Sequence, residues 1–229
     1  MINEDQKHSV GIYLQNLTFN EKEFFEEMYD HICSSFENRE DEQQTVRQHI
    51  YQVVEPAFGG KEGLRKIQQT QARARKKLVY KRALSLFSTY LFRWPTVLIT
   101  AILFLLLWQL NQLFDQVQVF EMVTTIGLLT PFFVSNYGKW RFQRQCKQHK
   151  MPYDNSQVNN TIHFLSISGV ALLFGLFSMV NRWAFGNRDG FLDFFSQYPV
   201  SFLPISTILL VYALVCLQLF KEKFQLKLV

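Results

Sequence analysis

Hydrophobic residues gather in four long windows in the second half of the chain. The windows cover residues 95–114, 117–136, 161–181 and 200–220. A helix needs about 20 mostly apolar residues to cross the hydrocarbon core of a bilayer. The first, third and fourth windows are apolar on all sides, whereas each helix of a soluble bundle would show a polar face. The second is the weakest, because Glu121 lies in its first turn and Pro131 lies inside it. The pattern predicts four transmembrane helices.

Shorter apolar stripes predict three helices before the first window. The residues of the three stripes are Phe25, Met28, Ile32 and Phe36; Val46, Ile50, Val53 and Val54; and Leu64, Ile67, Ala74 and Leu78. Their spacing of three and four residues is typical of one helix face. Two capping-box patterns, Thr18 with Glu21 and Asn20 with Glu23, mark the start of the first helix. The second helix is expected to begin near residue 42.

These elements predict an all-α protein with two domains. A small three-helix domain is expected over residues 1–82, followed by a domain of four membrane spans over residues 83–229. Residues 83–92 are apolar but directly follow a basic run. They are expected either to lie in the membrane interface as an amphipathic lead-in or to extend the first span.

Charge divides the chain into three environments. Residues 1–60 carry 12 Asp/Glu and 4 Lys/Arg, residues 61–82 carry one Glu and 9 Lys/Arg, and the other 147 residues carry 6 Asp/Glu and 11 Lys/Arg. The basic run adjoins the first span, where anionic lipid headgroups attract cations. The cations expected at the headgroups are Arg73, Arg75, Lys76, Lys77, Lys81 and Arg82. No direct nucleic-acid partner is expected, because the run lacks base-reading or aromatic groups.

Lys and Arg also predict the orientation in the membrane. They cluster before the first span, between the second and third, and after the fourth, and residues 139–150 alone hold five. The positive-inside rule then places both termini in the cytoplasm. Cys33, Cys146 and Cys216 are far apart and odd in number, so free thiols are predicted.

Candidate chemistry is sparse. No nucleophile with a base, paired carboxylates or metalloprotease motif can be assembled, so neither an enzyme nor a cofactor is predicted. Glu27 and His31 have a spacing that metal ligands use, but a closed zinc site needs four ligands and no second pair lies nearby. A structural role is expected for Asp30 and His31, with His31 tying its helix to the second helix or to the Gly59-Gly60 turn. That turn lacks the preceding strand of a phosphate loop.

Two alternatives rest on polar and small residues within the spans. A transport or permease component would have one water-filled cavity, lined by Thr124, Thr125, Thr130, Ser166 and Ser168. A structural membrane oligomer would use small residues of the third span, such as Gly169 and Gly175, for close helix packing. No span carries a central charge, which disfavours an ion relay.

The N-terminal segment carries a recognisable sequence pattern. It contains Asp30-His31-Ile32-Cys33, then Glu37, then Phe58-Gly59-Gly60 with Gly63-Leu64, and finally a lysine-rich helix before the spans. Over about residues 13–80 it resembles the N-terminal helical domain of bacterial membrane proteins of the HAAS type. Residues 38–44 depart from that group because they lack its glycine and Phe-x-x-Ala pattern.

The resemblance implies a multi-pass protein of the bacterial cytoplasmic membrane without known enzymatic activity. It implies a signalling or regulatory adaptor, in some relatives found beside a PadR-like transcription regulator. The predicted partners are membrane lipids, a protein such as that regulator or a transporter subunit, and a second copy of the chain. The predicted partner-binding residues lie on the acidic face of the first helix and are Glu23, Glu26, Glu27, Asp30 and His31.

Overall fold

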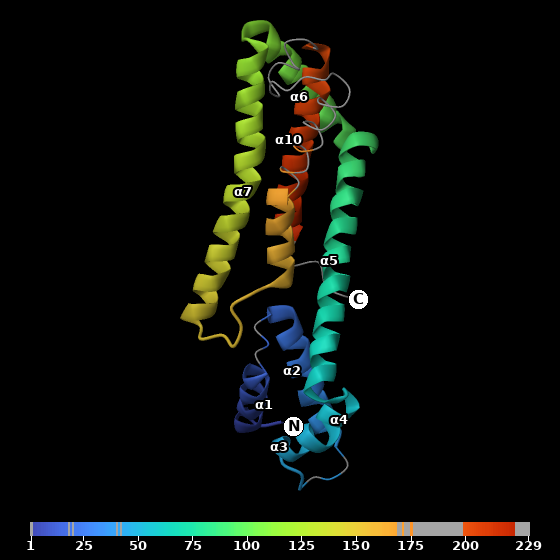
Figure 1. The fold of residues 1–229 in the computed structure, drawn as a ribbon, viewed down its shortest axis with the longest axis vertical. Coiled ribbons are helices and arrows are strands. Elements are labelled where there is room, and N and C mark those ends of the chain that lie inside the picture. Colours follow the sequence, from blue (N-terminus) through green and yellow to red (C-terminus); the bar gives the residue numbers. More distant parts are fainter. Residues whose placement is uncertain are drawn as a thin grey trace. The chain divides into compact units, whose positions relative to one another are not determined.

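The fold is built from helices. The computed structural model describes residues 2–17, 19, 21–39, 41, 43–168, 171, 175 and 199–222 (Figure 1). Within these residues no strand forms, and the one β-type contact is an isolated bridge between Glu21 and Asn155. The predicted all-α class is confirmed.

The chain forms two compact units. Unit 1 comprises Met1–Lys77 and Lys139–Asn160, and unit 2 comprises Leu78–Gly138 and Thr161–Val229. Helices α5 (Gly60–Phe92) and α7 (Gln116–Gln148) each supply residues to both units. Sequence analysis placed residues 139–160 between two spans of the membrane domain, whereas the structure includes them in the unit of the N-terminal helices.

Unit 1 has one apolar core, to which α1 (Glu4–Asn16), α2 (Lys22–Glu37), α3 (Val46–His49), η1 (Ile50–Val54) and the start of α5 contribute buried residues. Its remaining element is α4 (Glu55–Ala57). The predicted stripe of α2 is confirmed, because Phe25, Met28, Ile32 and Phe36 are all buried. Cys146 of α7 and Tyr153 after it belong to the same apolar core.

An additional helix, α1, precedes the three predicted helices, the first of which corresponds to α2. Helix α1 starts after Asn3, whose side-chain oxygen accepts a hydrogen bond from the Gln6 backbone N–H at 2.8 Å, while the Gln6 side chain accepts one from the Asn3 N–H at 2.9 Å. This reciprocal capping box satisfies two N–H groups at the helix start. At the start of α2, Glu21 is the N-cap and makes no side-chain cap hydrogen bond. Thr18 and Asn20 of the predicted boxes lie outside the described residues.

The second predicted helix contains a π-helical segment. It starts after Thr45, which forms a capping box with Gln48. Val46, Ile50 and Val54 are buried as predicted, but Val53 is 43% exposed. The π-helix η1 takes an extra residue into its turn, which moves Val53 off the buried face.

The apolar stripe predicted for the third helix is correct only near its start. Leu64 is fully buried, but Ala74 and Leu78 are exposed, and the buried positions are instead Arg75 and Val79. The chain stays helical to Phe92, and Arg93–Pro95 separate α5 from the first span. Residues 83–92 therefore continue the basic helix and do not extend that span.

Three of the described helices are long and apolar enough to cross a membrane. They are α6 (Thr96–Leu113), α7 over Gln118–Gln148, and α10 (Pro199–Glu222) over Leu203–Glu222. Thus the first, second and fourth predicted spans coincide with long apolar helices. The structure describes only residues 161–168, 171 and 175 of the third predicted span. The other residues of that span, including Gly169, lie outside the described residues.

Helix α7 continues beyond the predicted second span. Its 33 residues correspond to about 50 Å at 1.5 Å per residue, which exceeds a hydrocarbon core of about 30 Å. Four of the five Lys and Arg residues at 139–150 are therefore helical rather than in a loop, and Lys150 lies in the turn after α7.

Small residues of α7 allow close approach of α10 within unit 2. A Cβ atom at Gly138 would overlap the Phe220 ring, and one at Gly127 would lie 3.7 Å from the Leu209 carbonyl oxygen. By contrast, a Cβ at Gly175 would meet nothing within 4 Å. The predicted role of Gly175 in an oligomer stays a prediction.

The turn before α5 depends on three glycines. Gly59 and Gly60 both have φ of +73°, a conformation that side chains with a Cβ rarely adopt. At Gly63, a Cβ atom would overlap the Phe58 backbone carbonyl. The third glycine is required by this close backbone approach.

We expect Gly63→Ala to destabilise the start of α5 by about 1–3 kcal/mol, because the backbone must shift to admit the methyl group. Hydrogen–deuterium exchange of the full chain measures this as faster exchange over residues 58–70. Gly11→Ala, where a Cβ meets nothing within 4 Å, is the control and should not accelerate exchange. Equal exchange in both variants would contradict the steric explanation.

Candidate functional site

The candidate site is the acidic face of α2. Glu23, Glu26, Glu27 and Asp30 follow one another at spacings of three, one and three residues, which places them on one side of a helix. The opposite side carries the buried apolar stripe. The helix therefore directs four carboxylates away from its own core.

Glu23 binds the start of the helix over residues 157–168. Its Oε1 accepts hydrogen bonds from the Ser156 hydroxyl at 2.5 Å and the Val158 N–H at 3.3 Å, and its Oε2 accepts one from the Gln157 N–H at 3.0 Å. The first N–H groups of a helix have no partner within the helix, and a carboxylate there is favoured by the helix dipole. Next to this contact, the Lys22 N–H donates to the Asn155 carbonyl at 2.8 Å. Glu23 thus joins α2 to the segment that follows α7.

Glu26 binds Tyr153 in the same segment. The Tyr153 hydroxyl donates to Glu26 Oε1 at 2.8 Å, and the tyrosine ring stacks on Phe142 and meets Phe25 edge-on. Burial and the neighbouring Glu26 carboxylate raise the pKa of Tyr153. The hydroxyl therefore stays protonated and serves as a donor at neutral pH.

Glu27 pairs with a buried arginine of α5. Arg75 Nη2 donates to Glu27 Oε2 at 2.6 Å, and Gln71 Nε2 donates to Glu27 Oε1 at 2.9 Å. Arg75 is only 5% exposed. Within the described part of the chain, its Nη1 and Glu21 Oε2 are buried without a hydrogen-bond partner, and burial raises the pKa of Glu21. Removing Glu27 would leave a buried guanidinium uncompensated, which is costly.

Asp30 and His31 occupy the end of the acidic face. Both are exposed. The His31 ring packs edge-on against Phe58 at a centroid distance of 5.2 Å, next to the Gly59-Gly60 turn to which it was expected to tie α2. Asp30 is therefore an exposed carboxylate of the predicted partner-binding set.

His49, which would have to join Glu27 and His31 to form a metal site, is instead buried in the core of unit 1. His49 is 3% exposed, and its ring nitrogens lie 2.8 Å from the Ser35 hydroxyl and 3.0 Å from the Gln44 side-chain oxygen. Burial lowers the pKa of His49. Among the described residues no three His, Cys, Asp or Glu side chains group as metal ligands.

The six cations expected at lipid headgroups fall into two groups. Arg73, Lys76, Lys77 and Lys81 are exposed on α5. Arg75 is buried against Glu27, and Arg82 forms a two-pronged pair with Glu222 of α10 at 2.9 and 3.0 Å. The exposed four have the accessibility that headgroup binding requires, whereas Arg75 and Arg82 already have carboxylate partners.

Sequence analysis missed the partners of the acidic face. Tyr153 and Ser156 lie in a short segment treated as an inter-span loop, and Arg75 was one cation in a basic run. One local signal was available: Ser156 is a good N-cap residue before a helical stretch, and its hydroxyl accepts from the Asn159 N–H at 3.3 Å. Its pairing with Glu23, 133 residues away, has no sequence signature.

These features define a class: a helical protein with at least three helices able to span a membrane, and a polar unit in which α2 binds the segment after α7. Comparisons with protein-family models, curated proteins and solved structures found no match to the chain. The likeness to HAAS-type proteins accordingly stays a prediction.

Replacing Glu23 by Ala should release the start of the helix over residues 157–168. Loss of three hydrogen bonds to a cap is expected to cost about 1–2 kcal/mol. Hydrogen–deuterium exchange of the full chain should show faster exchange at residues 156–161. Asp30→Ala removes a carboxylate from the same helix and is the control. Protection unchanged in Glu23→Ala would show that the cap is dispensable.

Proposed function

We propose that the chain is a multi-pass protein of the bacterial cytoplasmic membrane that acts as a regulatory adaptor through unit 1. Unit 1 would lie in the cytoplasm with both termini, as the distribution of Lys and Arg predicts. The three long apolar helices support the membrane anchor. The exposed cations of α5 would bind anionic headgroups next to it.

The observation that carries this proposal is the contact between α2 and residues 153–158. An adaptor needs a folded surface whose state depends on the membrane part of the chain. The Glu23 and Glu26 contacts supply such a dependence, because they bind α2 to a segment connecting α7 with the next helix. A displacement of that segment would change the acidic face that a partner reads.

The partner surface would centre on the middle of α2. Asp30 and His31 are exposed there, and the side chains of Glu26 and Glu27 keep 51% and 48% exposure despite their internal contacts. A basic surface on a soluble regulator or on a transporter subunit has the matching charge. Glu23 would not contact the partner, because it binds residues 156–158 of the chain itself.

Charge reversal at Asp30 tests the adaptor. Full-length protein captured from its native membrane should bring down a stoichiometric partner, and Asp30→Lys should reduce that capture by about tenfold, because it places like charges together at the contact. Glu62→Lys, an exposed reversal on α5, is the matched control. Mass spectrometry of the co-purified proteins gives the readout.

Undiminished capture by Asp30→Lys would refute the assignment of this surface. Recovery of the chain alone would refute the adaptor and favour the oligomer or the transport component.

A transport role is the second candidate, and buried oxygen atoms in three spans favour it. Asn111 Oδ1 of α6, Thr124 Oγ1 of α7 and Ser206 Oγ of α10 are buried and have no hydrogen-bond partner among the described residues. Unsatisfied polar atoms are costly within a membrane, so they are often found where a polar solute or water enters. Of the cavity residues predicted from sequence, Thr125 is exposed and Ser166 donates to the Ile162 carbonyl of its own helix.

Chemical labelling at position 206 distinguishes a water-filled cavity from a helix bundle that excludes water. In a transporter, Ser206→Cys should react with a membrane-impermeant methanethiosulfonate reagent, whereas in an adaptor with a dry bundle it should stay unmodified. The mass of the peptide containing residue 206 reports the reaction. Leu209→Cys, a buried apolar position in the same helix, is the control.

A further inference from the structure

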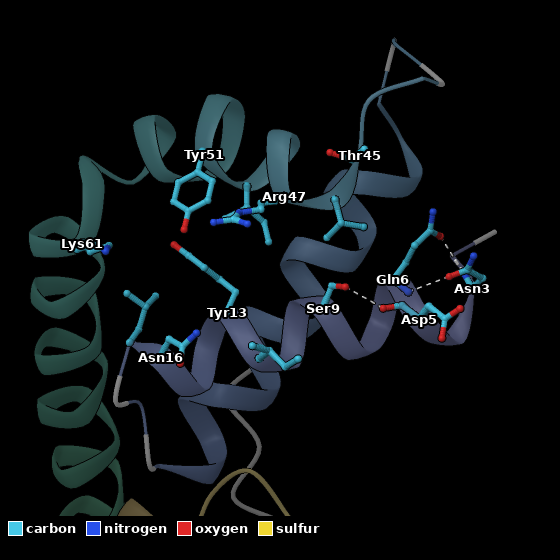
Figure 2. Close-up of a pocket in the computed structure, with 14 residues that line it drawn as sticks. Asn3, Asp5, Gln6, Ser9, Tyr13, Asn16, Thr45, Arg47, Tyr51 and Lys61 are labelled. Carbon is cyan, nitrogen blue, oxygen red and sulfur yellow. Dashed lines mark hydrogen bonds between the residues drawn. The ribbon is translucent and has the colours of Figure 1, made fainter.

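A pocket in unit 1 lies apart from the acidic face of α2. It is bounded by α1, by the stretch from Thr45 to Tyr51, and by the start of α5 at Lys61, and it encloses about 600 Å³ (Figure 2). Small-molecule sites usually have about 300–1,000 Å³. The pocket therefore has the size of a small-ligand site.

The walls of the pocket are apolar and aromatic. Ile12 contributes exposed aliphatic surface, whereas Val46 and Ile50 border the pocket but are only 5% and 2% exposed. The rings of Tyr13 and Tyr51 meet edge-on at a centroid distance of 6.1 Å. The Tyr13 hydroxyl donates to Glu55 at 3.0 Å, which fixes this wall. Ile12 and Tyr51 are 45% and 46% exposed. Apolar area is thus open to solvent inside a formed pocket.

Two cations line the pocket without a carboxylate partner. Among the described residues, neither Arg47 nor Lys61 forms an ion pair, and the Arg47 guanidinium lies 5.9 Å from the centre of the Tyr51 ring. The other basic residues before position 60 are engaged: Lys7 pairs with Glu4, Lys22 lies 3.9 Å from Glu26, and Arg39 donates to the Phe36 carbonyl. Arg47 is the exception in an acidic segment.

The remaining polar groups favour an anion at one end. In Figure 2, Lys61, Tyr51 and Arg47 lie toward one end of the pocket, and Asp5 lies toward the other. The Tyr51 hydroxyl has no hydrogen-bond partner among the described residues. Tyr51 and Ile50 belong to the π-helix η1, and such segments occur frequently at functional sites.

We propose that this pocket binds a small organic anion with an apolar body. Its carboxylate or other acidic group binds Arg47 and Lys61 and accepts a hydrogen bond from the Tyr51 hydroxyl. Its apolar body lies against Ile12 and the rings of Tyr13 and Tyr51. The site goes beyond the adaptor proposal, since binding here requires no protein partner.

The probe for this site is 6-fluoro-2-naphthoate, an aromatic carboxylate observed by fluorine NMR. It is titrated into the full-length protein in lipid nanodiscs, and empty nanodiscs correct for partition into lipid. We expect saturable line broadening with a Kd below about 1 mM. Arg47→Gln should weaken binding about tenfold or more, and Lys61→Gln should weaken it less because an ammonium is more strongly hydrated than a guanidinium and lacks its two-pronged geometry.

Two comparisons make the test specific. The neutral 6-fluoro-2-naphthamide should bind more weakly than the carboxylate and should not respond to Arg47→Gln. Lys66→Gln removes an exposed cation of α5 that does not line the pocket, and it should leave binding unchanged. Ile12→Trp, which fills the apolar part, should abolish binding of both probes.

The proposal fails if the wild-type protein gives no saturable signal beyond that of empty nanodiscs. It also fails if Arg47→Gln and Lys61→Gln bind the carboxylate as tightly as the wild type. Because Arg47 and Lys61 are exposed, these substitutions are expected to change the stability of the fold little.

Discussion

The cap that Glu23 places on the helix over residues 157–168 is the contact on which unit 1 depends. A helix start leaves several N–H groups without partners, and a carboxylate facing a protein surface loses hydration. Here the two needs are met together, because one carboxylate takes two backbone N–H groups and the Ser156 hydroxyl. Three charge-assisted hydrogen bonds at one carboxylate are stronger than neutral ones of similar length. They hold together two segments that are more than 130 residues apart.

Opposite net charges favour the packing of residues 139–160 with the N-terminal helices in unit 1. Residues 1–60 have a net charge of −8, residues 61–77 of +6 and residues 139–160 of +4, which leaves +2 for the three together. An isolated segment with a charge of −8 would repel itself when compact. The basic residues after Gly138 therefore offset the acidity of the N-terminal helices, in addition to the role in membrane orientation predicted for them.

What the sequence predicts well are features set by local periodicity. The windows matching α6, α7 and α10 are apolar over a span length, and the α2 stripe repeats every three or four residues, so neither depends on distant partners. Arg75 shows the limit of that method. Its place in a basic run predicts binding to lipid headgroups, but Glu27 and Gln71 accept hydrogen bonds from it that make burial tolerable. The prediction that Val53 is buried is wrong for another reason. The extra residue of a π-turn cannot be recognised from the amino-acid composition.

The near-neutral balance of unit 1 also bears on the pocket lined by Arg47 and Lys61. A strongly basic unit would attract any anion over a Debye length of about 8 Å and would discriminate little between them. With a net charge of only +2, long-range attraction is weak, and the affinity has to come from contacts inside the pocket. Two cations at one end can orient an acidic group, but the exposed wall of Ile12 and the Tyr13 and Tyr51 rings has to supply apolar burial. This balance selects an anion with an apolar body over inorganic phosphate, which would gain only the contacts with Arg47, Lys61 and Tyr51.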